Sequence, residues 1–237
     1  MGRIFEKRKH KMFARFDRMS KAFTRMGKEI AIAVKQGGPN PETNPRLRVA
    51  IQNAKGVNMP KDRIDAAIKR ASEKNAANLE EMVYEGYAPH GVAVLIETAT
   101  DNPTRTVANV RMYFTRYNGT LGKTGSLDFL FERKGVFKIR KGNLNLEEME
   151  LELIDSGLED IAVDNESGEV YIYTSFADFG SMSKALEEKN IPVISAEKQR
   201  IPSNKVKLDE SREDDVIKLV EALEQDDDVQ MVYYNMG

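Results

Sequence analysis

Apolar residues recur with helical spacing along the first third of the chain. Between Arg18 and Lys35 they fall on one side of a helix when projected at about 100° per residue. The opposite side is basic, and Gly37-Gly38-Pro39 ends the helix. The apolar side comprises Met19, Phe23, Met26, Ile30, Ala33 and Val34, and the single apolar exception on the basic side is Ile32.

Two shorter amphipathic helices are predicted to follow. The first begins at Asn44, a favourable N-cap, with Pro45 in the first helical position. The second begins near Asn58-Met59-Pro60. Their apolar sides consist of Leu47, Ala50, Ile51 and Ala54 in the first and Ile64, Ala67, Ile68 and Ala71 in the second. The apolar sides of three such helices must pack against one another to leave water, so a small helical domain is predicted.

Beyond a linker-like stretch from Ser72 to Glu81, the period of the pattern changes. Val92–Thr98 is typical of a strand, Thr104–Tyr117 of a helix and Leu127–Phe131 of another strand. A β-α-β unit is therefore predicted.

The rest of the chain repeats this alternation. Its strands are predicted at Val136–Ile139, Ile161–Val163, Val170–Tyr173, Val193–Ala196, Val206–Leu208 and Val229–Tyr234, and its helices at Leu146–Ile154, Phe179–Glu188 and Asp214–Leu223. The middle part reads β-α-β-β-α-β, the order of a ferredoxin-like domain. We predict an α+β protein of three domains, in which one ferredoxin-like α/β domain is inserted into another. The boundaries are 1–81 for the helical domain, 82–133 with 205–237 for the discontinuous domain, and 134–204 for the inserted one.

Charge divides the chain near position 78. Residues 1–78 hold 19 Lys and Arg against 7 Asp and Glu, a net charge of +12, whereas residues 79–237 hold 17 against 31, a net charge of −14. A basic region of this kind is the electrostatic footprint of a nucleic-acid-binding domain. The alternative is that the basic and acidic regions attract each other within the protein.

Composition removes several classes of function. Cysteine is absent, so disulfides, a thiol nucleophile and thiolate metal ligands are excluded. No stretch approaches the ~18 consecutive apolar residues that a membrane-spanning helix needs, and no secretory signal is recognisable. We therefore expect a cytoplasmic protein without a membrane partner.

An active site is difficult to assemble. His10 and His90 fall in different predicted domains, and no metal-ligand spacing is present. Gly122-Lys123-Thr124 resembles part of a phosphate-binding loop, but Tyr117 stands where its first glycine is required. A plain turn and a loop whose amides meet a nucleic-acid phosphate both remain open there. We predict that the protein is not an enzyme and needs no metal, cofactor or small-molecule substrate.

Several unusual motifs occur in one order along the chain. They are Gly37-Gly38-Pro39-Asn40-Pro41, Asn44-Pro45-Arg46-Leu47-Arg48, Asn58-Met59-Pro60-Lys61-Asp62, Tyr84-Glu85-Gly86-Tyr87, Asp101-Asn102 with Arg105-Thr106-Val107, and Gly122-Lys123-Thr124-Gly125-Ser126 with Arg133-Lys134-Gly135. Through them nearly the whole chain resembles the YebC/PmpR family. The start departs from the family pattern, because Gly2 is followed by Arg3-Ile4-Phe5 where most members have a Gly-His-Ser-Lys-Trp segment.

The resemblance implies a helical amino-terminal domain followed by two α/β domains. It also implies a bacterial transcriptional regulator that binds DNA. Related members act in translation, including a mitochondrial translational activator and factors that work on the ribosome. The resemblance therefore leaves both DNA and ribosomal or transfer RNA open as the target, with the transcription machinery or the ribosome as the wider partner.

The basic helical region supplies the candidate nucleic-acid-binding residues, since arginine adds bidentate geometry to its charge. The candidates are Lys7, Arg8, Lys9, Lys11, Arg15, Arg18, Lys21, Arg25, Lys28, Arg46, Arg48, Lys55, Lys61 and Arg63. Phe5, Phe13 and Phe16 either stack on unpaired bases or pack in the core. The leading hypothesis is a DNA-binding transcriptional regulator, and the alternative is a ribosome-associated translation factor. The acidic domains are alternatively protein-interaction modules.

Overall fold

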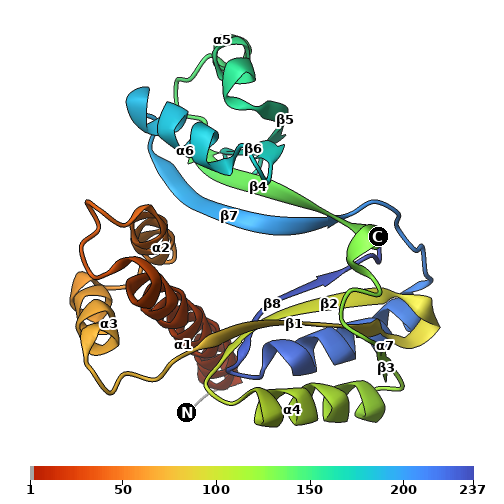
Figure 1. The fold of residues 1–237 in the computed structure, drawn as a ribbon. Coiled ribbons are helices and arrows are strands. Elements are labelled where there is room, and N and C mark those ends of the chain that lie inside the picture. The colour runs from red at the N-terminus through yellow and green to blue at the C-terminus, as the bar shows by residue number, and fades with distance from the viewer. Residues whose placement is uncertain (1–2) are drawn as a thin grey trace. The chain divides into compact units, whose positions relative to one another are not determined.

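Three helices form the first of the two units into which the chain divides, residues 1–80 and 81–237. The structure is a computed structural model that describes the backbone of residues 3–237 and the side chains from Met19 onward. The second unit contains two antiparallel four-stranded sheets (Figure 1). The predicted fold class is confirmed: α+β, with an amino-terminal helical region and two antiparallel sheets. Within the described residues, no helix is both long and apolar enough to cross a membrane.

The helical unit consists of α1 (Arg3–Gly37), α2 (Pro45–Gly56) and α3 (Lys61–Ser72). Its core contains Ile30, Ala33, Val34, Leu47, Ala50, Ala54 and Ile64. The amphipathic pattern therefore identified the buried sides of all three helices. Ile32, the apolar exception on the basic side, is only 6% exposed and lines a small pocket of about 170 Å³ with Ala77 and Leu79. The segment after α3 thus covers part of this side of α1.

A rigid corner joins α1 to α2. The buried Asn44 side chain donates to the carbonyl oxygens of Ala33 and Gly38, each at 2.8 Å, and accepts from the Leu47 amide at 3.0 Å. It thus caps α2 and also ties down the end of α1. A Cβ on Gly37 would lie 2.7 Å from the Asn44 side chain, so glycine is required there. The predicted Asn44 N-cap is confirmed.

The third helix begins where it was predicted, directly after Asn58-Met59-Pro60, but Asn58 does not cap it. Asn58 has a φ of 60° and its amide donates to the Lys55 carbonyl at 2.9 Å, so it closes the end of α2 instead of starting α3. Asparagine tolerates this left-handed conformation better than most residues. The N-cap of α3 is Pro60, without a side-chain hydrogen bond.

The first sheet of the second unit has the strand order β3-β1-β2-β8. Its elements are β1 (Glu80–Tyr87), the short 3-10 turn η1 (Pro89–Gly91), β2 (Ala93–Thr100), α4 (Pro103–Arg116), β3 (Thr120–Leu121), α7 (Glu210–Glu224) and β8 (Val229–Tyr234). Both α4 and α7 lie on one face (Figure 1). Leu127 and Phe131 cover β2 on the other face. Burial on both faces explains why β2 reads as a continuous apolar run.

The strand prediction for Leu127–Phe131 is wrong. Residues Asp128–Leu130 form a 3-10 turn, η2, because the chain here packs its apolar side chains onto β2. The strand that follows α4 is β3, so the β-α-β unit exists with a different second strand.

Two further predictions about this sheet need correction. The segment Ser72–Glu81 is not a linker throughout, because β1 begins at Glu80. Val206–Leu208 is not a strand, since it contributes only an isolated bridge between Val206 and Met236.

The second sheet has the order β5-β6-β4-β7, and every neighbouring pair is antiparallel. Its elements are β4 (Phe131–Arg140), α5 (Leu146–Leu153), η3 (Ile154–Ser156), β5 (Leu158–Asp164), β6 (Glu169–Ser175), α6 (Phe179–Glu188) and β7 (Val193–Pro202). Figure 1 shows α5 and α6 on the same side of this sheet. All of these elements lie between β3 and α7 in the chain, so the second sheet is inserted into the first.

Candidate nucleic-acid interface

The corner between α2 and α3 presents two lysines. Lys55 lies in the last turn of α2, and Lys61 is the first residue of α3. Both are exposed, and neither side chain makes a hydrogen bond or ion pair with any residue that the structure describes. Their charges are therefore available to a ligand.

Arg63 connects α3 to α1. Its guanidinium carbon lies 5.6 Å from the centroid of the Phe23 ring, and Phe23 itself packs partly against the helical core. A cation over an aromatic ring at an exposed site contributes about 0.5–1 kcal/mol. The contact fixes Arg63 at the level of Phe23 on α1 while the residue stays exposed.

Three cations of α1 lie near the same level. Lys21, Arg25 and Lys28 are half-buried, and each makes contacts within the protein. The Asn53 side chain donates to Glu29 Oε1 at 3.4 Å, which brings the end of α2 to this part of α1. Six candidates from three helices thus lie near the same level of the unit, with those of α1 on the side of that helix opposite its apolar face. We call them the proximal basic group: Lys21, Arg25, Lys28, Lys55, Lys61 and Arg63.

Arg46 and Arg48 do not belong to this group. Arg46 donates to Gln36 Oε1 at 2.6 Å, and Arg48 donates to the carbonyl oxygens of Pro41 and Glu42, each at 2.9 Å. Along α1, Gln36 lies about 20 Å from Phe23 at 1.5 Å rise per residue. The two arginines therefore brace the corner between α1 and α2, at the opposite end of the unit.

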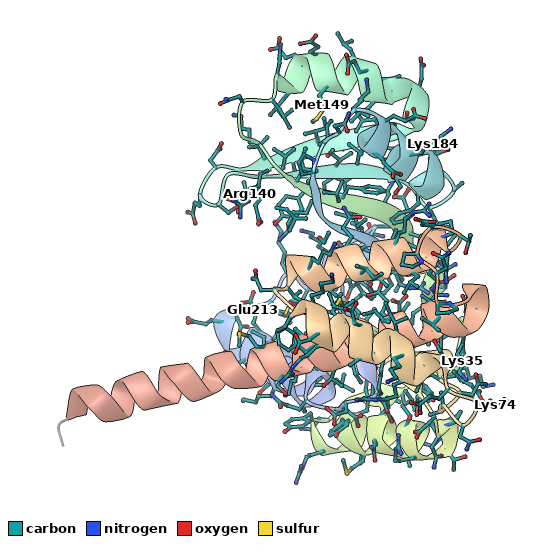
Figure 2. All side chains as sticks on the ribbon, turned by 90° about the vertical axis from the view of Figure 1, so that its left-hand side faces the viewer. Lys35, Lys74, Arg140, Met149, Lys184 and Glu213 are labelled. Carbon is teal, nitrogen blue, oxygen red and sulfur yellow. The ribbon has the colours of Figure 1, made fainter. Side chains whose placement is uncertain are left out.

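The remaining candidates occupy the amino-terminal turns of α1. These turns continue from the end that carries the proximal basic group and project past α2 and α3 (Figure 2). Lys7, Arg8, Lys9, Lys11, Arg15, Arg18 and the aromatic residues Phe5, Phe13 and Phe16 lie outside the described side chains.

Further exposed cations surround the helical unit. Lys69 and Arg70 lie in the last turn of α3, and Lys35 and Lys74 also project outward (Figure 2). Because residues 1–78 carry a net charge of +12, this surface attracts polyanions over a distance of about one Debye length, roughly 8 Å at physiological salt.

The loop that resembled part of a phosphate-binding motif is bound to a carboxylate of the protein itself. Glu85, only 3% exposed, accepts from the amides of Gly125 at 2.7 Å and Leu127 at 2.6 Å. The Gly122 amide donates to the Glu85 carbonyl at 2.7 Å. These amides are therefore not directed at a phosphate, and no pattern along the chain indicated that Glu85 is buried.

No catalytic arrangement emerges around the histidine whose side chain the structure describes. His90 has a φ of 64° in η1, and its Nε2 lies 3.2 Å from Asp215 Oδ2. The pKa of the Asp215 carboxyl is lowered, chiefly by this hydrogen bond and next by one from Lys218. From Met19 onward, no three His, Cys, Asp or Glu side chains are grouped so that they could hold a metal ion.

One carboxylate of the acidic run at 209–228 is buried. Asp228 is 5% exposed and accepts from Thr106 Oγ1 at 2.9 Å, Thr100 Oγ1 at 3.2 Å and Arg105 NH2 at 2.8 Å. It joins the start of β8 to the start of α4. The motif that contains Arg105 and Thr106 is thus explained by structural hydrogen bonds. Their partner, Asp228, lies more than 120 positions away in the sequence, so the role becomes visible only in the fold.

A basic helical unit followed by two sheets, one inserted into the other, defines a class of multidomain α+β proteins. Residues 3–74 match the TACO1/YebC protein N-terminal domain, and residues 79–236 match the TACO1/YebC second and third domain. The chain belongs to the TACO1/YebC family.

Individual relatives agree over the full length. A Cytophaga hutchinsonii protein is 61% identical over 237 residues, covering 100% of this chain and 99% of its own. A Myxococcus xanthus protein is 53% identical over 240 residues, covering 100% of both chains. Each is named "Probable transcriptional regulatory protein". The crystal structure of a conserved hypothetical protein from Aquifex aeolicus has a TM-score of 0.79 and 41% identity, covering 92% of this chain and 90% of that one.

Proposed function

We propose that this chain is a non-enzymatic regulator of transcription whose helical unit binds duplex DNA. The proximal basic group is the observation that carries the proposal, since it presents six cations from three helices near the same level of the unit. Duplex DNA carries one negative charge per about 1.7 Å of axis, so such a group meets several phosphates at once. Phosphate contacts position a protein without reading sequence, so sequence selection falls to other contacts.

Two further observations support this role. The Cytophaga hutchinsonii and Myxococcus xanthus relatives are named as regulators of transcription, which makes the transcription machinery in the cytoplasm the expected setting. The small pocket of about 170 Å³ in the helical unit is below the roughly 300–1,000 Å³ typical of ligand sites. This pocket of the helical unit is therefore too small for a typical small-molecule ligand.

A second candidate is a ribosome-associated translation factor. The observation that favours it is the net charge of −14 on residues 79–237, because an acidic body is repelled by nucleic acid but complements basic proteins. A ribosome offers both RNA for the helical unit and basic proteins for the acidic unit.

The salt dependence of binding tests the proposal. The full chain is titrated against a labelled DNA duplex from about 50 to 200 mM salt. If the proximal basic group meets six phosphates, log K should fall against log salt with a slope of about −5. A flat response would contradict the proposal. Binding that is steep with ribosomal RNA and absent with the duplex would favour the second candidate.

A further inference from the structure

An exposed aromatic ring lies between two cations in the acidic unit. Phe176 is 42% exposed, with the Arg133 guanidinium carbon 5.2 Å and Lys198 Nζ 4.6 Å from its ring centroid. Both cations are exposed as well. Arg133 lies in β4 and Lys198 in β7, and Phe176 directly follows β6.

The register of the sheet brings these residues together. Lys134 pairs with Ser175, so Phe176 falls beside Arg133, and Gly135 pairs with Lys198. Alternate residues of a strand share a face, which places all three side chains on the face that carries α6. Gly135 is required there, because its Cβ would lie 2.8 Å from the ring of Phe179. The cluster thus occupies the part of this face next to the start of α6.

The glutamates next to Arg133 and Lys198 in sequence point to the other face of the sheet. Lys134 Nζ lies 2.6 Å from both Glu132 Oε1 and Glu159 Oε2, on the face opposite Arg133. Glu197, beside Lys198 in sequence, accepts from Gln199 at 3.0 Å on that same opposite face. The Arg133 side chain makes no ion pair or hydrogen bond with any residue that the structure describes. The cluster is therefore a cationic surface within an acidic unit.

Stability of the sheet gives little reason for this arrangement. A cation over an exposed ring stabilises weakly, and burying the phenylalanine would stabilise more. Arg200, which lies on the same strand, shows what a structural cation looks like here, since it is 5% exposed and paired with Glu97 and Asp128. Arg133 and Lys198 remain at the surface.

We propose that Phe176, Arg133 and Lys198 hold an unpaired nucleotide of a single-stranded nucleic acid. Aromatic rings and guanidinium planes both stack on bases, and an ammonium group beside them meets the phosphate. Stacking needs an unpaired base, so this contact selects single-stranded segments over duplex. The inference rests on the proposed nucleic-acid-binding function but adds a second contact in the acidic unit.

Binding of single strands by the full chain tests the inference. Labelled DNA and RNA single strands of about 12 nucleotides are titrated by fluorescence anisotropy, alongside a duplex of the same sequence. F176L should weaken single-strand binding about tenfold and leave duplex binding unchanged, because one stacked base is lost. R133Q should weaken it similarly. A difference between the DNA and RNA strands identifies which one the site prefers.

Two control variants match these changes. F129L replaces another exposed phenylalanine, 76% exposed, and K184Q removes a charge from α6 of the same sheet domain (Figure 2). Neither should alter single-strand affinity. Equal affinity of F176L and the unchanged chain would overturn the inference, as would an equal loss on duplex and single strands. If the unchanged chain binds neither the duplex nor the single strands, the proposed function itself is rejected.

Discussion

Reversing Arg18, Lys21, Arg25 and Lys28 to glutamate should weaken duplex DNA binding about a thousandfold at physiological salt. Each phosphate contact contributes a slope of about −0.9 in log K against log salt, which is about fivefold per contact near 0.15 M. Four contacts then multiply to roughly a thousandfold. Affinity is measured by anisotropy on the full chain. The slope itself should also become shallower by nearly four.

Charge-matched variants separate this effect from the loss of net charge. Reversing Lys141, Lys184, Lys205 and Lys207, all exposed on the acidic unit, changes the net charge equally and should alter affinity far less. Lys55 and Lys61 provide the second check, because they are exposed and make no ion pair with any described residue. Replacing both lysines with glutamate should weaken duplex DNA binding about thirtyfold. Equal losses in the helical-unit and acidic-unit variants would contradict the proximal basic group as the binding surface.

Replacing Asp228 with alanine should lower the free energy of unfolding of the second unit by about 3 kcal/mol. Hydrogen bonds to a charged group contribute about 1.5–3 kcal/mol each, and Asp228 accepts three. Once Asp228 is removed, the Thr106 hydroxyl can donate its single proton to Thr100 Oγ1, 2.7 Å away, which limits the loss. Urea denaturation of the full chain measures the change.

The exposed Glu221 of α7 is the matched control, and its replacement by alanine should change stability by less than about 0.5 kcal/mol. T106V should cost about 1–2 kcal/mol and be less than additive with D228A, since both remove one network. A loss below about 1 kcal/mol for D228A would mean that the network does not hold α4 to β8.

Sequence patterns predicted the bounds of a helix or strand correctly wherever that element is determined by its own residues. The start of α2 follows from the side chain of Asn44 and the ring of Pro45, and both act within one turn. The boundaries of α6 and β8 were likewise predicted as observed, because their apolar spacing is regular and turn residues flank them.

Predictions failed where burial depends on a distant partner. The strand β1 contains Glu85 and Gly86, which weaken its apolar alternation. Glu85 is buried because it binds the loop at Gly125 and Leu127, and Gly86 is needed because a Cβ would lie 2.5 Å from the Thr120 carbonyl. Neither constraint is visible without the fold.

The positive charge of the candidate site was predictable from the sequence, but the arrangement of its side chains was less so. The excess of lysine and arginine in residues 1–78 identifies the region. It does not show that Arg46 and Arg48 brace a corner while Lys55 and Lys61 stay available, because carbonyl and amide partners leave no periodic pattern.

Ultraviolet crosslinking in living cells shows directly whether the helical unit binds DNA. The protein is purified under denaturing conditions, the attached DNA and RNA are both sequenced, and the crosslinked peptides are identified. We expect enrichment of discrete DNA segments attached to peptides from residues 1–80. If ribosomal or transfer RNA is attached to those peptides instead, the process that the protein regulates is translation and not transcription. Recovery of no nucleic acid above the uncrosslinked sample would contradict this expectation.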